Sequence, residues 1–238
     1  MTHKIFVACD SKNISKVKKI IKETQNSKLK IGYKFGLEFL NSKNGRLFLS
    51  KLKNKIIFAD LKLHDIPNTC ASAVKALNDL NINYLTIHIS SGLEALKAAK
   101  RVSNKIRLAG VSILTSLDNK SLKEIGFNKD VKKLVLLQAK LATKAKLDAI
   151  VCSAQEVKIV RKVFKKEIIT PGIRFTSKTN DQKRVLTPKE AYKNGSNWLV
   201  IGRPLTKGNI KKNLHILIDH LNQLSLIHIS EPTRRVFI

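Results

Sequence analysis

The chain has 238 residues, enough for one large domain with a well-buried core but without room for a second domain of that size. A hydrophobic share of 43% excludes disorder, and no apolar stretch reaches the roughly 18 residues that a membrane-spanning helix needs. The net charge of +29 would suggest a nucleic-acid partner, but the lysines spread over every predicted helix and the abundant Asn and Ile are typical of an AT-rich genome, so we expect no specific nucleic acid.

Short β-branched runs alternate with longer segments of helical periodicity along most of the chain. The predicted strands cover residues 5–9, 30–34, 56–62, 84–89, 106–113, 149–152, 168–171 and 198–201. Amphipathic segments predict helices at residues 14–22, 70–80, 93–102, 131–146 and 156–164. About eight such units in a chain of this length fit a closed α/β barrel of the (β/α)8, or TIM-barrel, type better than an open sheet. No G-x-G-x-x-G follows the first strand, which argues against dinucleotide binding.

The predicted barrel forms a single domain over residues 1–224. From residue 225 the sequence leaves its Lys- and Asn-rich style, and residues 225–238 resemble a translated sequencing adapter; an ordinary C-terminal extension is the alternative. We expect no function for this tail. The N-terminal residues run straight into an apolar strand pattern without a cleavable signal, and the three cysteines are scattered, so we expect a cytoplasmic protein with free thiols.

The third predicted strand ends in a cluster of charged residues. Asp60 and Lys62 lie two positions apart, so their side chains share one face of the strand, and in a barrel that face is the interior. Asp65 follows just after the strand, and Pro67 leads into a helix that Asn68 or Thr69 could cap. Two acids beside one lysine keep it protonated, which makes it a poor base but a well-placed proton donor. A structural ion pair that plugs the barrel mouth is the alternative interpretation.

The segment Asp60-Leu-Lys62-Leu-His-Asp65-Ile-Pro-Asn-Thr69 resembles the signature of the orotidine 5′-monophosphate decarboxylase family at every defining position. The resemblance extends over residues 4–224. A single short motif could match by chance, but a whole series of family motifs in the right order could not. The other family landmarks recur in order at successive strand ends: Asp10, Lys34, the segments 111–116 and 151–156, Pro171-Gly-Ile-Arg174, and Gly202-Arg203-Pro204.

The resemblance implies a cofactor-free and metal-free lyase that converts orotidine 5′-monophosphate to UMP and CO2 in pyrimidine biosynthesis. Lys62 would stabilise the C6 carbanion and protonate it, and Asp60 would crowd the departing carboxylate and hold Lys62. Asp65, counted as catalytic, and Thr69 would reach into the neighbouring subunit's site. The resemblance therefore also implies a homodimer with shared active sites.

The resemblance assigns substrate-binding roles to further residues. Asp10 and Lys34 would bind the ribose hydroxyls, Ser116 would contact the pyrimidine ring, and Pro171 would shape the pocket wall. Arg203 has an independent argument: Gly202 and Arg203 lie between the last strand and the last helix, where barrel enzymes commonly bind phosphate. An arginine that only caps a surface loop is the alternative.

Residues 175–187 form a long polar loop that we expect to act as a lid over the site. Here the sequence departs from the family pattern, because many members carry a glutamine shortly after the Pro-Gly-Ile-Arg motif, whereas Phe175 and Thr176 occupy that stretch. The nearest glutamine is Gln182. We count Arg174 and Gln182 as candidate substrate-binding residues, and which lid residue grips the phosphate stays open.

Two other classes of protein remain as alternatives. Sugar-phosphate lyases of the same barrel group, such as 3-keto-gulonate-6-phosphate decarboxylase or hexulose-6-phosphate synthase, share D-x-K-x-x-D but use Mg²⁺, so EDTA would separate them. A basic nucleic-acid-binding protein on a retired enzyme scaffold would have lost its charged site, and here the charged residues are all present.

Overall fold

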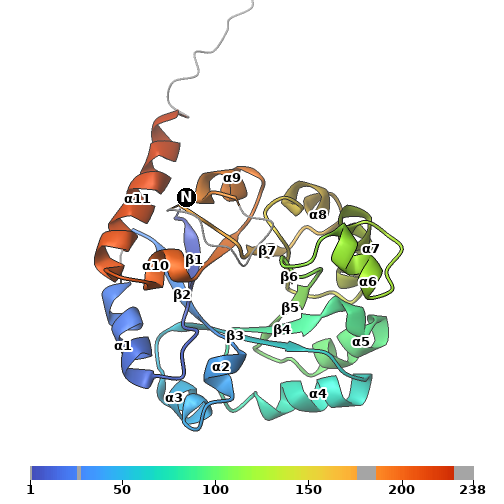
Figure 1. Cartoon of the computed structure of the whole chain (residues 1–238). Coiled ribbons are helices and arrows are strands. Elements are labelled where there is room, and N and C mark those ends of the chain that lie inside the picture. The colour runs from blue at the N-terminus through green and yellow to red at the C-terminus, as the bar shows by residue number, and fades with distance from the viewer. Residues whose placement is uncertain (1, 26–27, 176–185, 228–238) are drawn as a thin grey trace, which may run out of the picture.

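The computed structural model describes residues 2–25, 28–175 and 186–227. Eight parallel strands form a closed barrel in which each strand pairs with the next and the last pairs with the first (Figure 1). All eight predicted strands are confirmed, with ends that differ from the prediction by at most two residues. The strands are β1 (Lys4–Ala8), β2 (Lys30–Phe35), β3 (Ile56–Leu63), β4 (Tyr84–His88), β5 (Arg107–Val111), β6 (Ala149–Val151), β7 (Glu167–Thr170) and β8 (Trp198–Ile201).

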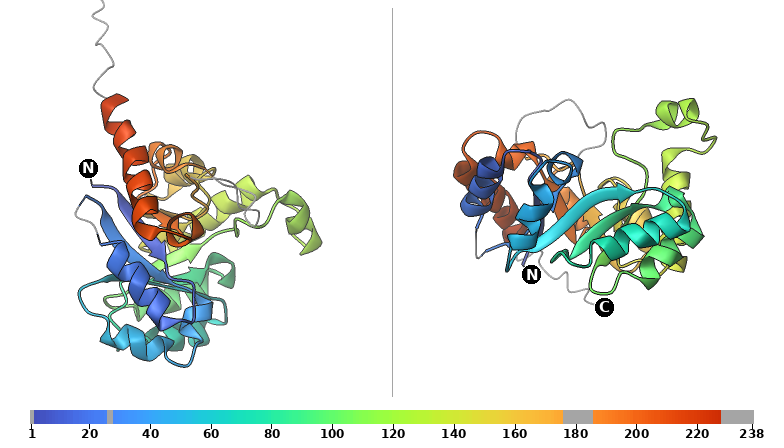
Figure 2. Two further views of the ribbon diagram at one scale, coloured as in Figure 1. Left: turned by 60° about the vertical axis from the view of Figure 1, so that its left-hand side comes forward. Right: turned by 90° about the horizontal axis from the view of Figure 1, so that it is seen from below.

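Helices surround the barrel, and each of the five predicted helices is present (Figure 1). The described helices are α1 (Ile14–Glu23), α2 (Leu37–Leu40), α3 (Gly45–Lys51), α4 (Pro67–Ala76), α5 (Leu93–Arg101), α6 (Asn119–Glu124), α7 (Val131–Lys144), α8 (Val157–Val163), α9 (Pro188–Lys193), α10 (Arg203–Thr206) and α11 (Ile210–Ile227), with a 3-10 turn η1 (Ile89–Ser91). The helix α6 projects away from the barrel body (Figure 2). Among these described helices, none is long and apolar enough to span a membrane.

The start of α4 differs from the prediction. The helix α4 begins at Pro67 with Ile66 as its N-cap, so the expectation that Asn68 or Thr69 caps it is wrong. The proline ring fixes φ near the helical value and lacks an N–H group, which suits the first turn and lets the helix begin at Pro67, before the predicted caps.

The helix α11 continues through Ile227, across the point where the sequence changes its style, and residues 228–238 lie outside the described residues.

Aromatic side chains fill the lower part of the barrel interior, at the N-terminal ends of the strands. The ring of Phe6 stacks on Trp198 with centroids 4.1 Å apart and meets Tyr84 edge-on at 5.3 Å. A Cβ at Gly32 would come within 2.6 Å of the Phe6 ring, so glycine gives this ring its room. Because these rings fill the lower interior, we look for a site at the C-terminal ends of the strands, where barrel enzymes carry their sites.

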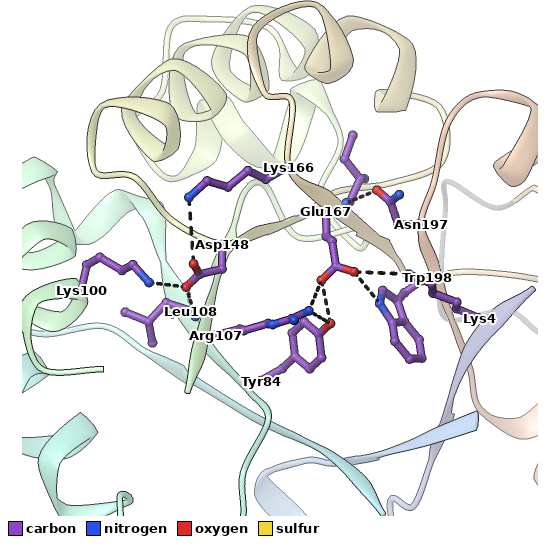
Figure 3. A network of polar contacts seen from close by, with 11 residues as sticks. Lys4, Tyr84, Lys100, Arg107, Leu108, Asp148, Lys166, Glu167, Asn197 and Trp198 are labelled. Atoms are coloured by element: carbon purple, nitrogen blue, oxygen red, sulfur yellow. Dashed lines mark hydrogen bonds and ion pairs between the residues drawn. The ribbon is translucent and has the colours of Figure 1, made fainter. Parts of the chain in front are cut away.

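A polar network closes the barrel below these rings (Figure 3). The carboxylate of Glu167 accepts hydrogen bonds from the Tyr84 hydroxyl at 2.6 Å, Arg107 Nη1 at 3.1 Å and Trp198 Nε1 at 3.2 Å. Burial and the adjacent Glu167 carboxylate raise the pKa of Tyr84 to about 12, so the phenol stays a hydrogen-bond donor. Beside this network, Asp148 accepts hydrogen bonds from Lys100 Nζ at 2.6 Å and from the Leu108 amide at 2.9 Å.

Candidate active site

A cavity of about 450 Å³ opens at the C-terminal ends of the strands. Its wall combines an apolar part, which includes Phe58, Val111 and Ile113, with charged groups from several strands. Most of the site residues predicted from the sequence line it: Asp10, Lys34, Asp60, Lys62, Pro171, Arg174, Gly202 and Arg203. This size and this mixture of surfaces suit a small polar ligand such as a nucleotide.

Four charged groups of alternating sign form a chain along one side of the cavity. Lys34 Nζ lies 2.8 Å from Asp10 Oδ1 and 3.4 Å from Asp60 Oδ2. Lys62 Nζ lies 2.9 Å from the same Asp60 oxygen. The side chains of Lys34 and Asp60 are only 11% and 13% exposed, whereas Lys62 is 33% exposed and Asp10 is 50% exposed. The buried members are therefore paired, and of the two lysines that line the cavity Lys62 has the more exposed side chain.

The electrostatics of the cluster keep its buried members charged. Burial by itself would raise the pKa of Asp60, but the Lys34 and Lys62 ammonium groups outweigh it and hold that pKa below its ordinary value. Burial likewise disfavours the charged form of Lys34, but Asp60 and Asp10 reverse this and raise its pKa. The lowered pKa of Asp60 and the raised pKa of Lys34 both indicate an anionic Asp60 next to a cationic Lys34.

A bulge in β3 sets the direction of the Lys62 side chain. The pairing of β3 with β4 shifts its register between Ala59 and Leu63, and Lys62 adopts a left-handed φ of 51°. The Lys62 amide donates a hydrogen bond to the side-chain oxygen Thr86 Oγ1 at 2.7 Å. The predicted proximity of Asp60 and Lys62 is confirmed, but in this strand it depends on the bulge as well as on the alternation of faces.

Gly36 allows the pair between Asp10 and Lys34 to approach closely. A Cβ at Gly36 would lie 2.8 Å from Asp10 Oδ1 and 3.3 Å from Lys34 Nζ. The sequence alone gives no reason for a glycine at this position. Only the tertiary contact shows that a side chain here would push against the carboxylate.

Asp65 and Thr69 lie outside the cavity wall. Both residues are exposed, and Asp65 Oδ1 accepts a hydrogen bond from the Ile66 amide at 2.7 Å at the start of α4. Within the part of the chain that the structure describes, Lys62 forms its ion pair with Asp60 and not with Asp65. The expectation that two acids of one chain flank Lys62 is therefore wrong, because the chain turns outward after the strand to begin α4.

Two other candidates are not among the residues that line the cavity in the described part of the chain. Ser116 is exposed and does not line the cavity, where Thr115 lies instead. Gln182 and most of the expected lid lie outside the described residues, so their place is not defined. The two ends of that loop are joined, since Ile173 and Leu186 form a β-bridge and the Arg174 amide donates to Leu186 O at 3.1 Å.

The predicted phosphate-binding position lies at the junction of β8 and α10. Gly202 is the N-cap of α10, Arg203 is its first residue, and both line the cavity. Arg174 brings a second guanidinium to the same cavity from the segment after β7. Among the described residues, no three His, Cys, Asp or Glu side chains gather in a way that could hold a metal ion.

Comparison with known proteins gives a consistent result. The family model described as "Orotidine 5'-phosphate decarboxylase / HUMPS family" matches residues 3–213. An orotidine 5'-phosphate decarboxylase of Wolbachia pipientis subsp. Culex pipiens is 46% identical over 182 residues, which cover 74% of this chain and 80% of the relative. One of Carboxydothermus hydrogenoformans is 40% identical over 218 residues, 86% of this chain and 90% of the relative.

A solved structure agrees with these relatives. The crystal structure of orotidine 5'-phosphate decarboxylase from Lactobacillus acidophilus matches with a TM-score of 0.78 at 30% identity, over 92% of this chain and 99% of that chain. The family model and the relatives both cover most of the sequence, and the barrel carries its charged cluster where the strands end. The chain belongs to the orotidine 5'-phosphate decarboxylase / HUMPS family.

Proposed function

We propose that the chain decarboxylates orotidine 5′-monophosphate to UMP and CO2 without a cofactor, in the cytoplasmic synthesis of pyrimidines. The enzymes of this name are carbon–carbon lyases, and relatives that carry the name match most of the chain. The observation that carries the proposal is the Asp60–Lys62 pair at 2.9 Å in a cavity of nucleotide size. A protonated amine held beside a buried carboxylate is suited to stabilise a carbanion and then to donate a proton to it.

Lys62 and Asp60 have complementary roles in this reaction. Loss of CO2 breaks the bond to C6 of the pyrimidine and leaves its electron pair on that carbon. The Lys62 ammonium stabilises this charge electrostatically and then donates a proton to C6, after which solvent restores the lost proton. The Asp60 carboxylate stands next to the departing substrate carboxylate and repels it, and it holds the Lys62 amine in position.

The remaining cavity residues would bind the parts of the substrate that do not react. Asp10 and Lys34 would take the ribose hydroxyls, and Arg203 with Gly202 would take the phosphate, with Arg174 as a second cation on the cavity wall. Pro171 would shape the wall, Ser116 would need a movement of its loop to contact the substrate, and Gln182 remains a candidate outside the described residues. Binding energy from the remote phosphate can be used to close such loops over the site.

We propose that the active form is a homodimer in which each subunit completes the other's site. The turn that starts α4 exposes Asp65 and Thr69 together with Ile66, whose exposed fraction is 66%. A carboxylate, a hydroxyl and a large apolar side chain exposed on one turn are the groups that a partner subunit would bury. Asp65 and Thr69 would then act on the partner's substrate.

Mixed dimers test this sharing. Lys62→Ala and Asp65→Asn homodimers are each expected to be inactive, but refolding them together in equal amounts forms hybrids with one intact site each. Random pairing then restores about a quarter of wild-type turnover. The matched control mixes Lys62→Ala with Asp60→Asn, which damage the same site and should restore none. Equal recovery in both mixtures, or none in either, would contradict shared sites.

The reaction itself is tested by following the ultraviolet absorbance of orotidylate with EDTA present. Wild-type protein is expected to form UMP, and Lys62→Ala is expected to lose turnover while it stays folded. Lys30→Ala is the matched control, because Lys30 is exposed at the opposite end of a barrel strand. No turnover by a folded wild-type protein would overturn the assignment.

The second candidate is a metal-dependent sugar-phosphate lyase, since the family description joins the two groups. It predicts no loss of orotidylate and an aldol or decarboxylation activity on a sugar phosphate that Mg²⁺ restores after EDTA. The same assay, run with each substrate with and without Mg²⁺, separates the two candidates.

A further inference from the structure

Thr86 is a buried polar residue that neither the sequence motifs nor the proposed mechanism uses. It lies in β4, and its exposed fraction is 0%. Strand alternation puts Thr86 on the same inward face as Tyr84 and His88, while Leu85 and Ile87 pack outward against the helices. The hydroxyl of Thr86 therefore lies inside the barrel, between the aromatic floor and the mouth.

The Thr86 hydroxyl connects two members of the charged cluster. It accepts a hydrogen bond from the Lys62 amide at 2.7 Å and donates one to Asp60 Oδ1 at 3.1 Å. A hydroxyl has one proton to donate and lone pairs to accept with, so both bonds can form together. The other carboxylate oxygen, Oδ2, is then left to the two lysines, at 2.9 Å from Lys62 and 3.4 Å from Lys34.

The hydroxyl stands where the strand pairing is interrupted. Ala59 pairs with Leu85 and Leu63 pairs with Ile87, so β3 advances four residues while β4 advances two. Lys62 lies in this extra length with a φ of 51°, a conformation that costs an L-residue about 1 kcal/mol or more. Thr86, between the two paired positions of β4, supplies from its side chain the acceptor that a regular ladder would supply from its backbone.

We propose that Thr86 is a positioning residue for the decarboxylation: its hydroxyl holds the Asp60 carboxylate and the Lys62 backbone in the geometry from which Lys62 protonates the substrate. The inference rests on the proposed function, because it acts through the proposed proton donor. Without the hydroxyl, the Asp60 carboxylate can rotate about its Cβ–Cγ bond, and the Lys62 amide loses its partner at the bulge. Both changes move the ammonium group relative to the reacting carbon.

The expected effect falls on turnover and not on substrate affinity. Thr86 does not line the cavity, so substrate binding groups such as Arg203 stay in place. A misplacement of about 1 Å in a reacting group can lower the rate about 10²-fold. We therefore expect Thr86→Val, which keeps the shape but removes the hydroxyl, to lower kcat between roughly tenfold and a hundredfold with KM changed less than about threefold.

Two further variants separate positioning from stability. Thr86→Ser keeps the hydroxyl and loses a buried methyl, so it should lower the melting temperature but keep kcat within about threefold of wild type. Thr170→Val is the matched control, because Thr170 is also fully buried in a barrel strand and its hydroxyl bonds to Ser196 Oγ at 2.7 Å, outside the charged cluster. It should lose stability without losing kcat.

The outcomes decide the proposal. A large loss of kcat in Thr86→Val, rescue in Thr86→Ser and normal kcat in Thr170→Val support it. A normal kcat in Thr86→Val, or an equal loss in Thr86→Val and Thr86→Ser, overturns it. If Thr86→Val does not fold, Thr86→Ala against Thr86→Ser makes the same comparison, since both lack the methyl and differ in the hydroxyl. Absence of orotidylate turnover in wild type would instead be a failure of the proposed function, and the role of Thr86 would fall with it.

Discussion

Lys34 is the residue on which the charged cluster depends most. Its ammonium group lies between Asp10 and Asp60, and its side chain is only 11% exposed. Two carboxylates beside each other, one of them buried, would repel, and the shared lysine offsets that repulsion. The family resemblance implies a role of Lys34 toward the ribose, and the geometry adds a second role, the stabilisation of Asp60 as an anion.

Replacing Lys34 by Met should therefore lower the stability of the protein as well as its substrate binding. The change keeps most of the length of the unbranched side chain but leaves Asp10 and Asp60 without their shared cation, and we expect a loss of about 3 kcal/mol in the free energy of unfolding. Urea denaturation at neutral pH measures this loss.

Lys100→Met is the control for the Lys34 variant. Lys100 pairs with Asp148 at 2.6 Å but is 28% exposed, so its replacement should cost about 1 kcal/mol. An equal or larger loss in the Lys100 variant would show that the two-carboxylate arrangement around Lys34 does not contribute to stability.

At the scale of elements, the lower ends of β4, β7 and β8 are held together by one carboxylate. Burial would raise the pKa of Glu167, but hydrogen bonds from Tyr84 and Trp198 and the charges of Arg107 and Lys4 lower it below its ordinary value. A carboxyl group whose pKa is lowered on folding contributes stability above the pKa of the unfolded chain, and this stability is lost as the pH falls through the lower, folded pKa.

Glu167→Gln should thus reduce stability in a pH-dependent way. At pH 7 the variant loses a charged acceptor in a network of donors, which is worth about 2 kcal/mol. The difference from wild type should shrink as the pH falls below about 4.5, where Glu167 of the unfolded chain takes up a proton, and should be lost as the pH passes through the lower pKa of folded Glu167. Urea denaturation of both proteins, at steps of about one pH unit between about pH 3 and pH 7, measures this difference in stability. A difference that is constant over this range would contradict the ionic origin.

The helix α9 starts with a capping box that follows the expected lid. Thr187 Oγ1 accepts from the Glu190 amide at 3.3 Å, and Glu190 Oε2 accepts from the Thr187 amide at 2.8 Å. Thr187→Ala should cost about 1 kcal/mol of stability. Thermal unfolding measures it against Ser50→Ala, whose hydroxyl bonds an exposed helical carbonyl and caps no helix start. Equal melting temperatures for the two variants would count against the cap.

At the scale of the whole molecule, the residues that give the chain its net charge are different from those that form the site. The net charge of +29 belongs to lysines distributed over the surface, whereas the site uses a few charges at the strand ends. A distributed positive charge attracts polyanions by releasing their counterions, without recognition of sequence.

We therefore expect weak RNA binding that depends strongly on salt. Fluorescence anisotropy with labelled oligo(U) and oligo(A) should give similar affinities at low salt. For about six to ten phosphate contacts, the affinity should fall by roughly 10³-fold or more between about 50 and 200 mM salt. Tight binding that survives high salt, or a strong preference for one sequence, would instead indicate a dedicated nucleic-acid site.

The class of fold and the strand ends that carry the chemistry can be predicted from the sequence. The alternation of β-branched runs and amphipathic segments predicted every strand within two residues, because such periodicities follow from local backbone geometry. In a barrel of parallel strands all carboxyl ends meet at one mouth, so Asp10, Lys34, Asp60 and Arg203 were expected to converge, and they line one cavity.

How the charged side chains at the strand ends contact one another is visible only in the three-dimensional structure. The β3 bulge, the contact between Lys34 and Asp60, and the hydrogen bonds of Thr86 all depend on the register between neighbouring strands. The periodicity of a single strand does not encode that register, which is set when the strands pair and pack. The same limit explains Asp65, because the direction of the chain after β3 is decided by the start of α4 and not by the spacing of charges.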